Sequence, residues 1–408
     1  MPLRSTRGAT RRTTARRRSC AIRHTCTSGP LRAASAALTL LVGAAPALAA
    51  QRYWRGQLYP YVYYNTIDGV WGAFHFGRYS PVGAVERPED NLASLSFDAG
   101  ASTQGSYLVL ADARAPAWWE GWRAGLRLTA ARANRLGYYG LGNDTRYSSD
   151  SLTTAGPYFY RVSRTYVAAR ATIQRRVVGP LRALAGAAVE RSDFRALPGP
   201  SVFRTDLASG TVDPATVPFT DKIIRAGFVL DTRDNELDPH SGVIVEALFA
   251  SGTGYTRATA DARVQVHPVA KLVVAGRLGA ERMGGMPPVA AQEEMESSER
   301  PFVAVGGYRS LRGYHDGRFT GPGKLLGGLE ARYAVLWKPS LVELKIVAFF
   351  DAGRVFGPGE AVRLTTADLH TSAGGEIALR FLRNSLIVVG YGRGSEGGQL
   401  VFGTTWSY

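Results

Sequence analysis

Cysteine is nearly absent from this sequence. Its 408 residues include two cysteines, Cys20 and Cys26, and both precede the apolar stretch 33–50. That stretch has the form of a cleavable export signal, so the mature chain is predicted to contain no cysteine, and neither residue is placed for lipidation after cleavage. A disulfide framework and a thiolate metal site are thereby excluded, and nothing contradicts an oxidising compartment.

Long apolar runs and domain linkers are also missing after residue 50. No later segment approaches 18 consecutive apolar residues, whereas a transmembrane helix needs about 20, so a helical membrane protein is excluded. Roughly 359 residues follow the predicted cleavage site, and they contain no Pro- or Ser-rich linker and no break in composition. This length would suit two ordinary domains, but the uniform composition favours one large architecture.

Residues typical of enzyme active sites are scarce. The mature chain has five histidines, and none of them stands in a nucleophile or metal spacing such as HExxH. These are His75, His240, His267, His315 and His370. The adjacent pair His240 and Ser241 falls in the segment 238–242, DPHSG, which has the composition of a turn. We therefore predict no catalytic residue, no cofactor and no metal.

Four further segments have a composition that could suit a ligand site. The glycine-rich segments 321–323 and 392–394 lack the strand-to-helix context of a phosphate-binding loop, and we interpret them as turns. The acidic run 293–300, EEMESSER, resembles a metal-binding cluster, but a mobile, solvated loop is the simpler interpretation. The segment 138–143, YYGLGN, is expected to shape an external loop.

The first residues carry a targeting signal. Residues 1–32 hold nine arginines and no acidic residue, and the apolar stretch that follows ends in Ala47-Leu48-Ala49. A basic region, a short apolar region and a small-residue cleavage site are the parts of a secretory signal. We predict a signal peptide over 1–49. The long basic region also suits a twin-arginine signal, nucleic-acid binding or a start codon assigned too far upstream.

Removing the signal changes the electrostatic picture. The formal charge of +16 falls by nine, to +7, so more than half of the apparent basicity belongs to the presequence. A nucleic-acid partner is therefore not predicted.

The recurrent signal in the mature chain has a period of two residues. In the segment 343–351, Leu344 and Ile346 fall on one face while Glu343 and Lys345 fall on the other. Side chains of a strand point alternately to opposite sides, so one face is apolar and the other charged. The segments 122–131, 257–267 and 328–337 repeat this pattern.

Arginines and carboxylates recur together on the polar face, strand after strand. A soluble β-sandwich also alternates, but it rarely needs so many charges opposite its packed core. A transmembrane β-barrel explains the pattern, because lipid demands apolar side chains outside and a wet lumen tolerates paired charges. We predict an all-β fold, a 16-stranded antiparallel barrel over 58–408 after a short periplasmic lead over 50–57. The predicted strands are 58–65, 69–77, 94–101, 105–113, 121–131, 157–175, 181–191, 222–231, 242–252, 256–267, 270–279, 326–338, 343–352, 371–381, 384–391 and 398–408.

The connections predict an orientation. If the chain starts in the periplasm, the long segments 132–156, 192–221 and 280–325 lie outside, as expected for a bacterial barrel. In the last predicted strand, 398–408, the apolar side chains share one face. They are Leu400, Phe402, Trp406 and Tyr408, which we expect to face lipid and to end at the membrane interface. The predicted location is the Gram-negative outer membrane.

Three motifs then resemble a known family. The segment 306–314, GGYRSLRGY, resembles the arginine-glycine-aromatic motif in the sixth external loop of the BamA/TamA superfamily, also called the bacterial surface antigen barrels. Downstream, 327–330, GGLE, and 349–353, FFDAG, are similar to the motifs of that family's twelfth and thirteenth strands. The segment 231–242, which holds DTRD and PHSG, adds to the match. The resemblance covers essentially the whole mature chain.

The resemblance implies a loop that folds back into the lumen. Arg312, followed by Gly313 and Tyr314, would be the inserted cation, and Glu330 and Asp351 would be its acceptors. Both carboxylates lie on the polar face of adjacent predicted strands, and an arginine fork can bind a carboxylate through two hydrogen bonds. The alternative is that Arg312 lies in a solvated external loop.

In one respect the sequence departs from the family. Members that insert or secrete proteins carry periplasmic POTRA repeats, and only about eight residues separate the predicted cleavage site from the first strand. Two functions stay open. In the first, the barrel helps to insert or move a polypeptide or lipid, and Gly403 weakens the seam between the first and last strands. In the second, the barrel is a structural or pore-forming surface protein. Expected partners are outer-membrane lipids and other outer-membrane or periplasmic proteins.

Overall fold

The structure, a computed structural model, describes residues 53–65, 67–82, 88–338, 342–381 and 385–408. The predicted signal peptide 1–49 lies outside these residues. The first strand begins at Arg55, inside the segment expected to be a periplasmic lead.

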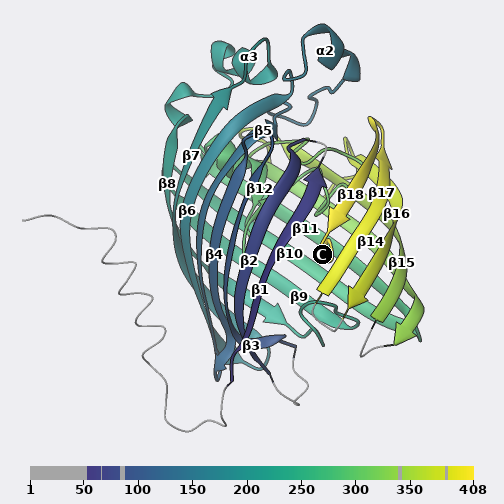
Figure 1. The fold of residues 1–408 in the computed structure, drawn as a ribbon. Coiled ribbons are helices and arrows are strands. Elements are labelled where there is room, and N and C mark those ends of the chain that lie inside the picture. The colour runs from purple at the N-terminus through teal and green to yellow at the C-terminus, as the bar shows by residue number, and fades with distance from the viewer. Residues whose placement is uncertain (1–52, 66, 83–87, 339–341, 382–384) are drawn as a thin grey trace, which may run out of the picture. The chain divides into compact units, whose positions relative to one another are not determined.

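Sixteen strands form one antiparallel sheet in which each strand pairs with the next one along the chain (Figure 1). The number of strands and their order confirm the prediction. The strands are β1 (Arg55–Asn65), β2 (Gly69–Pro81), β3 (Asn91–Ser102), β4 (Tyr107–Trp119), β5 (Trp122–Gly137), β6 (Arg161–Val178), β7 (Leu181–Ala196), β8 (Phe219–Asp231), β9 (Gly242–Gly252), β10 (Tyr255–Val269), β11 (Leu272–Gly285), β14 (Gly323–Lys338), β15 (Val342–Phe356), β16 (His370–Phe381), β17 (Ser385–Gly394) and β18 (Gly397–Gly403).

The sheet places apolar and charged side chains on the opposite faces from those of a soluble protein. Its large apolar side chains point outward and are exposed, for example Leu329 at 61% and Ile346 at 54%. Their neighbours along the same strands point inward and are buried, with Glu330 at 2% and Lys345 at 4%. An apolar outside and a charged inside are what a barrel wall needs in lipid.

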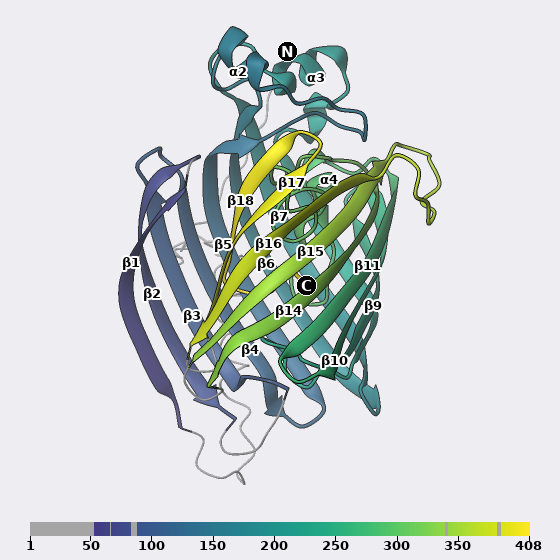
Figure 2. The same cartoon turned by 90° about the vertical axis from the view of Figure 1, so that its right-hand side faces the viewer.

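The two ends of the sheet are β1 and β18, which Figure 2 shows apart from each other. Within the described residues, no strand pairing joins β1 to β18. The antiparallel wall agrees with the prediction, but the hydrogen-bonded closure expected of the barrel is not part of the described pairing.

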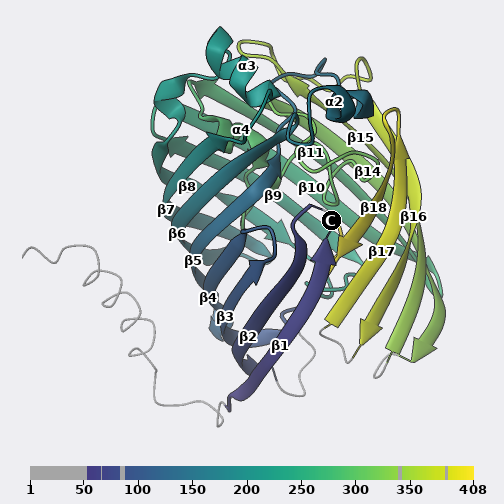
Figure 3. The same cartoon turned by 45° about the horizontal axis from the view of Figure 1, so that its top comes forward.

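The last strand is shorter than predicted. β18 ends at Gly403, and the final five residues leave the sheet and turn to its inner side. Leu400 and Phe402 are exposed as expected, but Trp406 and Tyr408 are buried. The prediction that these two aromatic residues face lipid is therefore wrong. Figure 3 marks the C-terminus within the curve of the sheet.

Long connections gather at one end of the strands. That end carries the short helices α2 (Ser149–Thr154) and α3 (Val202–Ser209), which Figures 1 and 3 show together at the rim. The segment 286–322, called loop 286–322 below, holds α4 (Val289–Glu293) and a separate two-stranded sheet, β12 (Glu294–Met295) with β13 (Phe302–Val303). Among the described helices, none has the length and apolar content to cross a bilayer.

Candidate functional site

Arg312 lies at the centre of a buried group of carboxylates. Its Nε and Nη2 donate to Oδ2 and Oδ1 of Asp351 at 2.9 and 2.7 Å. Nη1 donates to Oε1 of Glu330 at 2.6 Å and to Oε1 of Glu376 at 3.2 Å. The backbone N–H of Arg312 also donates to Asp351, at 3.1 Å. All four side chains are fully shielded from solvent, so this is a buried, charge-assisted network.

Three neighbouring strands supply the acceptors. Glu330 lies on β14, Asp351 on β15 and Glu376 on β16, and the register pairs Gly328 with Asp351. The sequence motifs pointed to the first two carboxylates and missed Glu376. Glu376 does lie on the inner face of a predicted strand, but only the register between β15 and β16 brings it to Arg312.

The remaining motif residues shape the walls of this site. The Arg312 guanidinium lies 3.7 Å from the centre of the Phe349 ring, a cation–π contact. Gly374 leaves room for that ring, because a Cβ there would lie 2.6 Å from it. At Gly353, a Cβ would lie 2.9 Å from Leu311. In the FFDAG segment, Phe349 thus supplies the ring under the guanidinium, Asp351 accepts its hydrogen bonds, and Gly353 lets Leu311 of the loop pack closely.

Gly313 and Tyr314 pack against β17. A Cβ on Gly313 would lie 2.5 Å from backbone atoms of residues 393 and 394, so glycine is required there. The Tyr314 hydroxyl lies 3.0 Å from the Ser395 hydroxyl. Gly394 makes space for the Tyr314 ring. The segment 392–394 is part of a strand, which corrects its interpretation as a turn.

The acidic run 293–300 forms a second anchor of the loop. Oε1 of Glu296 accepts from Arg225 at 2.6 Å and from Arg170 at 2.9 Å, and both arginines project from the wall. Glu293 accepts from Arg164 at 3.2 Å. The expectation that this run is solvated is wrong through Ser298, because arginines of β6 and β8 pair with its carboxylates inside the sheet, whereas Glu299 and Arg300 are exposed.

Arg318 forms a third anchor, near the rim. Its Nε donates to Glu396 at 2.7 Å, and its Nη2 donates to the backbone carbonyl of Thr145 at 2.6 Å. The guanidinium also lies over the ring of Tyr139, in the segment 138–143 that was expected to shape an external loop. This segment therefore packs on loop 286–322.

The C-terminal tail, residues 404–408, lies on the same inner side of the sheet as Arg312. Trp406 Nε1 donates to Asp238 at 2.8 Å, and the Ser407 hydroxyl donates to Glu330 at 2.6 Å. Arg332 Nη2 donates to the backbone oxygen of Tyr408 at 3.0 Å. Glu330 therefore joins the tail to Arg312. Sequence reasoning missed this contact, since the tail alternates as a lipid-facing strand would.

Asp238 lies in the turn between β8 and β9 and reaches across to β15. Its two carboxylate oxygens accept from Lys345 Nζ at 2.8 and 2.7 Å. Among the described residues, Asp238, His240 and Glu343 form the one group with atoms close enough to share a metal ion. Lys345 lies between two of them, 3.3 Å from Glu343, and already supplies the positive charge. The group is better explained as an ion pair than as a metal site.

Comparisons with known proteins agree with this architecture. The model of the Omp85 superfamily domain matches residues 94–393. Among solved structures, BamA from Haemophilus ducreyi lacking POTRA domains 1-3 is 14% identical, with a TM-score of 0.53 over 85% of this chain and 69% of that chain. CdiB from Escherichia coli is 9% identical, with a TM-score of 0.55 over 87% of this chain and 63% of that chain. No curated protein matches in sequence. Because the family model covers most of the chain, this protein belongs to the Omp85 superfamily, whose barrels include BamA and CdiB.

Proposed function

We propose that this barrel assists the insertion or translocation of a polypeptide or lipid at the outer membrane. Membership of the Omp85 superfamily supports an outer-membrane barrel of the insertion and translocation type. The observation that carries the proposal is the absence of pairing between β1 and β18 in the described chain. Unpaired strand edges carry free backbone groups, which are costly in hydrocarbon and can pair with an incoming strand.

The tail contacts support a seam that stays open. The ring of Tyr308, in loop 286–322, lies where a side chain on Gly403 would be, at 2.2 Å from a Cβ built there. The Tyr308 hydroxyl donates to the backbone oxygen of Thr405 at 2.6 Å. These contacts turn the chain inward after Gly403, so β18 offers a shorter edge than β1. Gly403 thus weakens the seam by admitting a loop residue, beyond the loss of packing expected of any strand glycine.

Within this proposal, Arg312 holds loop 286–322 inside the lumen. The contacts of Arg312 with Glu330, Asp351 and Glu376, called the Arg312 lock below, join the loop to three strands. Glu330 also binds Ser407, so the same carboxylate holds the tail. A change in the lock would therefore reach the last strand.

The test compares assisted insertion with conductance in liposomes. The full chain, with Cys20 and Cys26 replaced by serine, would carry Val62→Cys on β1 and Leu400→Cys on β18, joined by bismaleimides of increasing length. Both positions point outward. The control pair, Val62→Cys and Gly72→Cys, joins strands that are already paired.

We expect the β1–β18 cross-link to abolish assisted folding of a second barrel, while the β1–β2 cross-link leaves it unchanged. Equal activity of both cross-linked proteins would refute a role of the seam. Ion conductance without any assisted insertion would instead favour a pore-forming surface barrel. Recovery of the chain as a soluble periplasmic protein would contradict both functions.

A further inference from the structure

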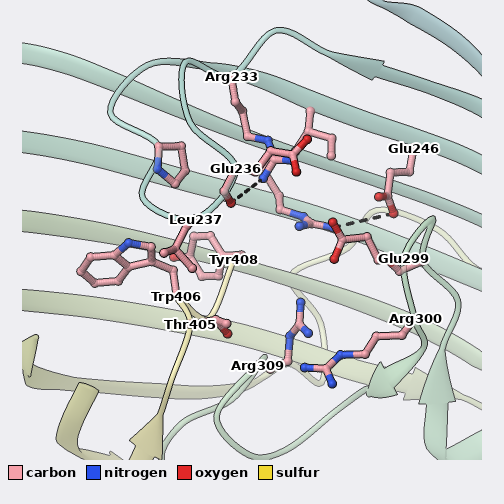
Figure 4. Close-up of a pocket in the computed structure, with 14 residues that line it drawn as sticks. Arg233, Glu236, Leu237, Glu246, Glu299, Arg300, Arg309, Thr405, Trp406 and Tyr408 are labelled. Carbon is pink, nitrogen blue, oxygen red and sulfur yellow. Dashed lines mark hydrogen bonds and ion pairs between the residues drawn. The ribbon is translucent and has the colours of Figure 1, made fainter. Parts of the chain in front are cut away.

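Two adjoining cavities lie inside the sheet, between loop 286–322, the turn 232–241 and the C-terminal tail. Their volumes are about 120 and 250 Å³, and Glu299, Arg300 and Thr405 line both. Figure 4 shows the smaller cavity, with Arg300 and Arg309 on the side of Thr405.

Arginines outnumber carboxylates among the residues that line the two cavities. Eight arginines and four carboxylates line them. Six of the arginines pair with a carboxylate within 4.0 Å, and these are Arg114, Arg123, Arg127, Arg170, Arg233 and Arg263. In the part of the chain that the structure describes, Arg300 and Arg309 have no such partner. Glu299, which lines both cavities, is engaged by Arg114 at 3.4 Å.

Arg309 has an unsatisfied donor. Its Nε is buried and has no hydrogen-bond partner among the described residues. Its guanidinium lies over the ring of Phe302, and only its backbone carbonyl is engaged, by Arg277. Burial, together with the neighbouring cations Arg277, Arg263 and Arg300, lowers the pKa of Arg309 to about 10. A buried, charged donor without an acceptor is costly, so an anionic ligand would be stabilising here.

From this geometry we propose that Arg300 and Arg309 form a binding site for a phosphate group. A guanidinium presents a planar fork that matches phosphate oxygens through paired hydrogen bonds. The two arginines belong to different parts of loop 286–322, and Thr405 of the tail adds a hydroxyl to the same cavity. Donors from separate segments suit a tetrahedral oxyanion better than a planar carboxylate.

The position of the site connects it with the tail. Thr405 is the residue whose backbone oxygen accepts from Tyr308. A phosphate held by Arg300, Arg309 and Thr405 would bridge the loop and the residues that follow β18. The phosphate is supplied either by the headgroup of a phospholipid or by a free phosphate ion, which share this chemistry. This site stands independently of the seam and of the proposed function.

The test measures binding by calorimetry to the purified full chain in phosphate-free detergent. One arm titrates inorganic phosphate. A second titrates dihexanoyl phosphatidylglycerol, with dihexanoylglycerol as the matched compound without phosphate. We expect Arg300→Gln and Arg309→Gln each to weaken binding about tenfold, since each removes charged hydrogen bonds. Arg195→Gln, at an exposed arginine paired with Asp193, should leave binding unchanged.

A second measurement uses the unaltered protein, so its result does not depend on whether the variants fold. Phosphate or the phospholipid should shield Arg300 and Arg309 from modification by phenylglyoxal, read by mass spectrometry, while Arg195 stays reactive. Protection by inorganic phosphate alone identifies the free ion as the ligand, and protection by the phospholipid alone identifies the headgroup. Absence of binding and of protection in both arms, or an equal loss of binding in Arg195→Gln, would overturn the site.

Discussion

The inner face of β14–β16 differs from the inner face of β1–β3. On β14–β16, carboxylates of three strands surround Arg312 and also hold the tail. On β1–β3, aromatic rings of β1 and β2 form a ladder, in which the Tyr63 ring stacks on Trp71 at 5.6 Å and on Tyr61 at 6.1 Å. Among the described residues of these strands, the one hydrogen bond to a carboxylate joins His75 of β2 to Asp98 of β3, at 2.7 Å. Tyr63 and Tyr59, which lie on the same strand, both keep more than two fifths of their surface exposed.

The difference lies in the range of the contacts. Arg312 binds carboxylates that lie 18 to 64 positions away from it in the chain, so β14–β16 can loosen only if loop 286–322 leaves the lumen. The aromatic ladder on β1 and β2 is local, because Tyr63 touches Tyr61, two positions away, and Trp71, its partner on the next strand. Regions with few buried contacts open first, so β1–β3 should be the less stable end of the sheet.

The largest effect is expected at the Arg312 lock. Arg312→Ala leaves three buried carboxylates without their shared cation, which should cost about 3–5 kcal/mol where the site is dry. Loop 286–322 should then become accessible to protease, whereas β1–β3 should be unaffected. Limited proteolysis with mass spectrometry would measure this.

Asp351→Ala should have a similar effect, and the double variant should be little worse than either single one, because members of one network do not add. Arg195→Ala, at an exposed arginine, is the matched control. Equal trimming of the loop in wild type and Arg312→Ala would show that Arg312 does not hold it, and the two regions would not differ as described.

The Arg312 lock also shows how much of the structure could be predicted from the sequence. The alternation of apolar and charged residues is local, so the strands could be predicted with ends that differ from the structure by up to six residues. Arg312, Glu330 and Asp351 stood in motifs, and the three side chains meet in the structure. Glu376 was missed, because its approach to Arg312 depends on strand register, which no local pattern states.

The inward turn of the tail and the burial of the acidic run could not be predicted from the sequence, because both depend on contacts between residues that are distant in the chain. Leu400, Phe402, Trp406 and Tyr408 alternate as a lipid-facing strand would. What turns the tail inward is the Tyr308 ring against Gly403, a contact that is invisible in the pattern. The acidic run 293–300 has the composition of a solvated loop. Its burial depends on arginines that lie more than 60 positions earlier.

The second effect concerns the outer faces, where the two regions should behave alike. Ile346→Arg on β15 and Phe74→Arg on β2 both replace an exposed apolar side chain on the outer face. Each should cost about 2–4 kcal/mol if its site lies near the bilayer midplane. Urea titrations in liposomes would measure these costs. If neither arginine substitution were destabilising, the assignment of these outer faces to lipid would fail.

At one inner position, Lys345, we expect a substitution to be strongly destabilising. Lys345 points to the lumen, where a substitution would ordinarily be tolerated. However, its ammonium group binds buried Asp238 through both carboxylate oxygens. Lys345→Ala would leave Asp238 with Arg380 as its nearest cation, at 3.3 Å. We therefore expect a cost nearer to that of Arg312→Ala than to that of an exposed lumenal residue.

The third effect tests the aromatic ladder. Tyr63→Ala removes the ring that stacks on Trp71 at an interplanar angle of 9°, which should cost about 0.5–1.5 kcal/mol beyond the lost buried area. Hydrogen exchange should then become faster in β1 and β2 while β14–β16 keep their protection. Tyr107→Ala, at an exposed residue of β4, serves as the control. Faster exchange throughout the sheet would mean that the two regions unfold together.

The smallest effect is expected from pH, and it should act on the region that the loop fills. His315 stacks on Tyr139 at 5.6 Å, and burial together with the nearby Arg161 lowers its pKa to about 4 from an ordinary value of 6.5. Between these values the unfolded segment binds a proton that the packed loop does not, so the packing is fully stable above pH 6.5 and weakens as the pH falls toward 4. Protease access to the loop should therefore rise modestly from pH 7 to pH 5, and His315→Gln should flatten this profile. His267→Gln, at an exposed histidine, should keep the wild-type profile, and a profile unchanged by His315→Gln would assign the acid response to other groups.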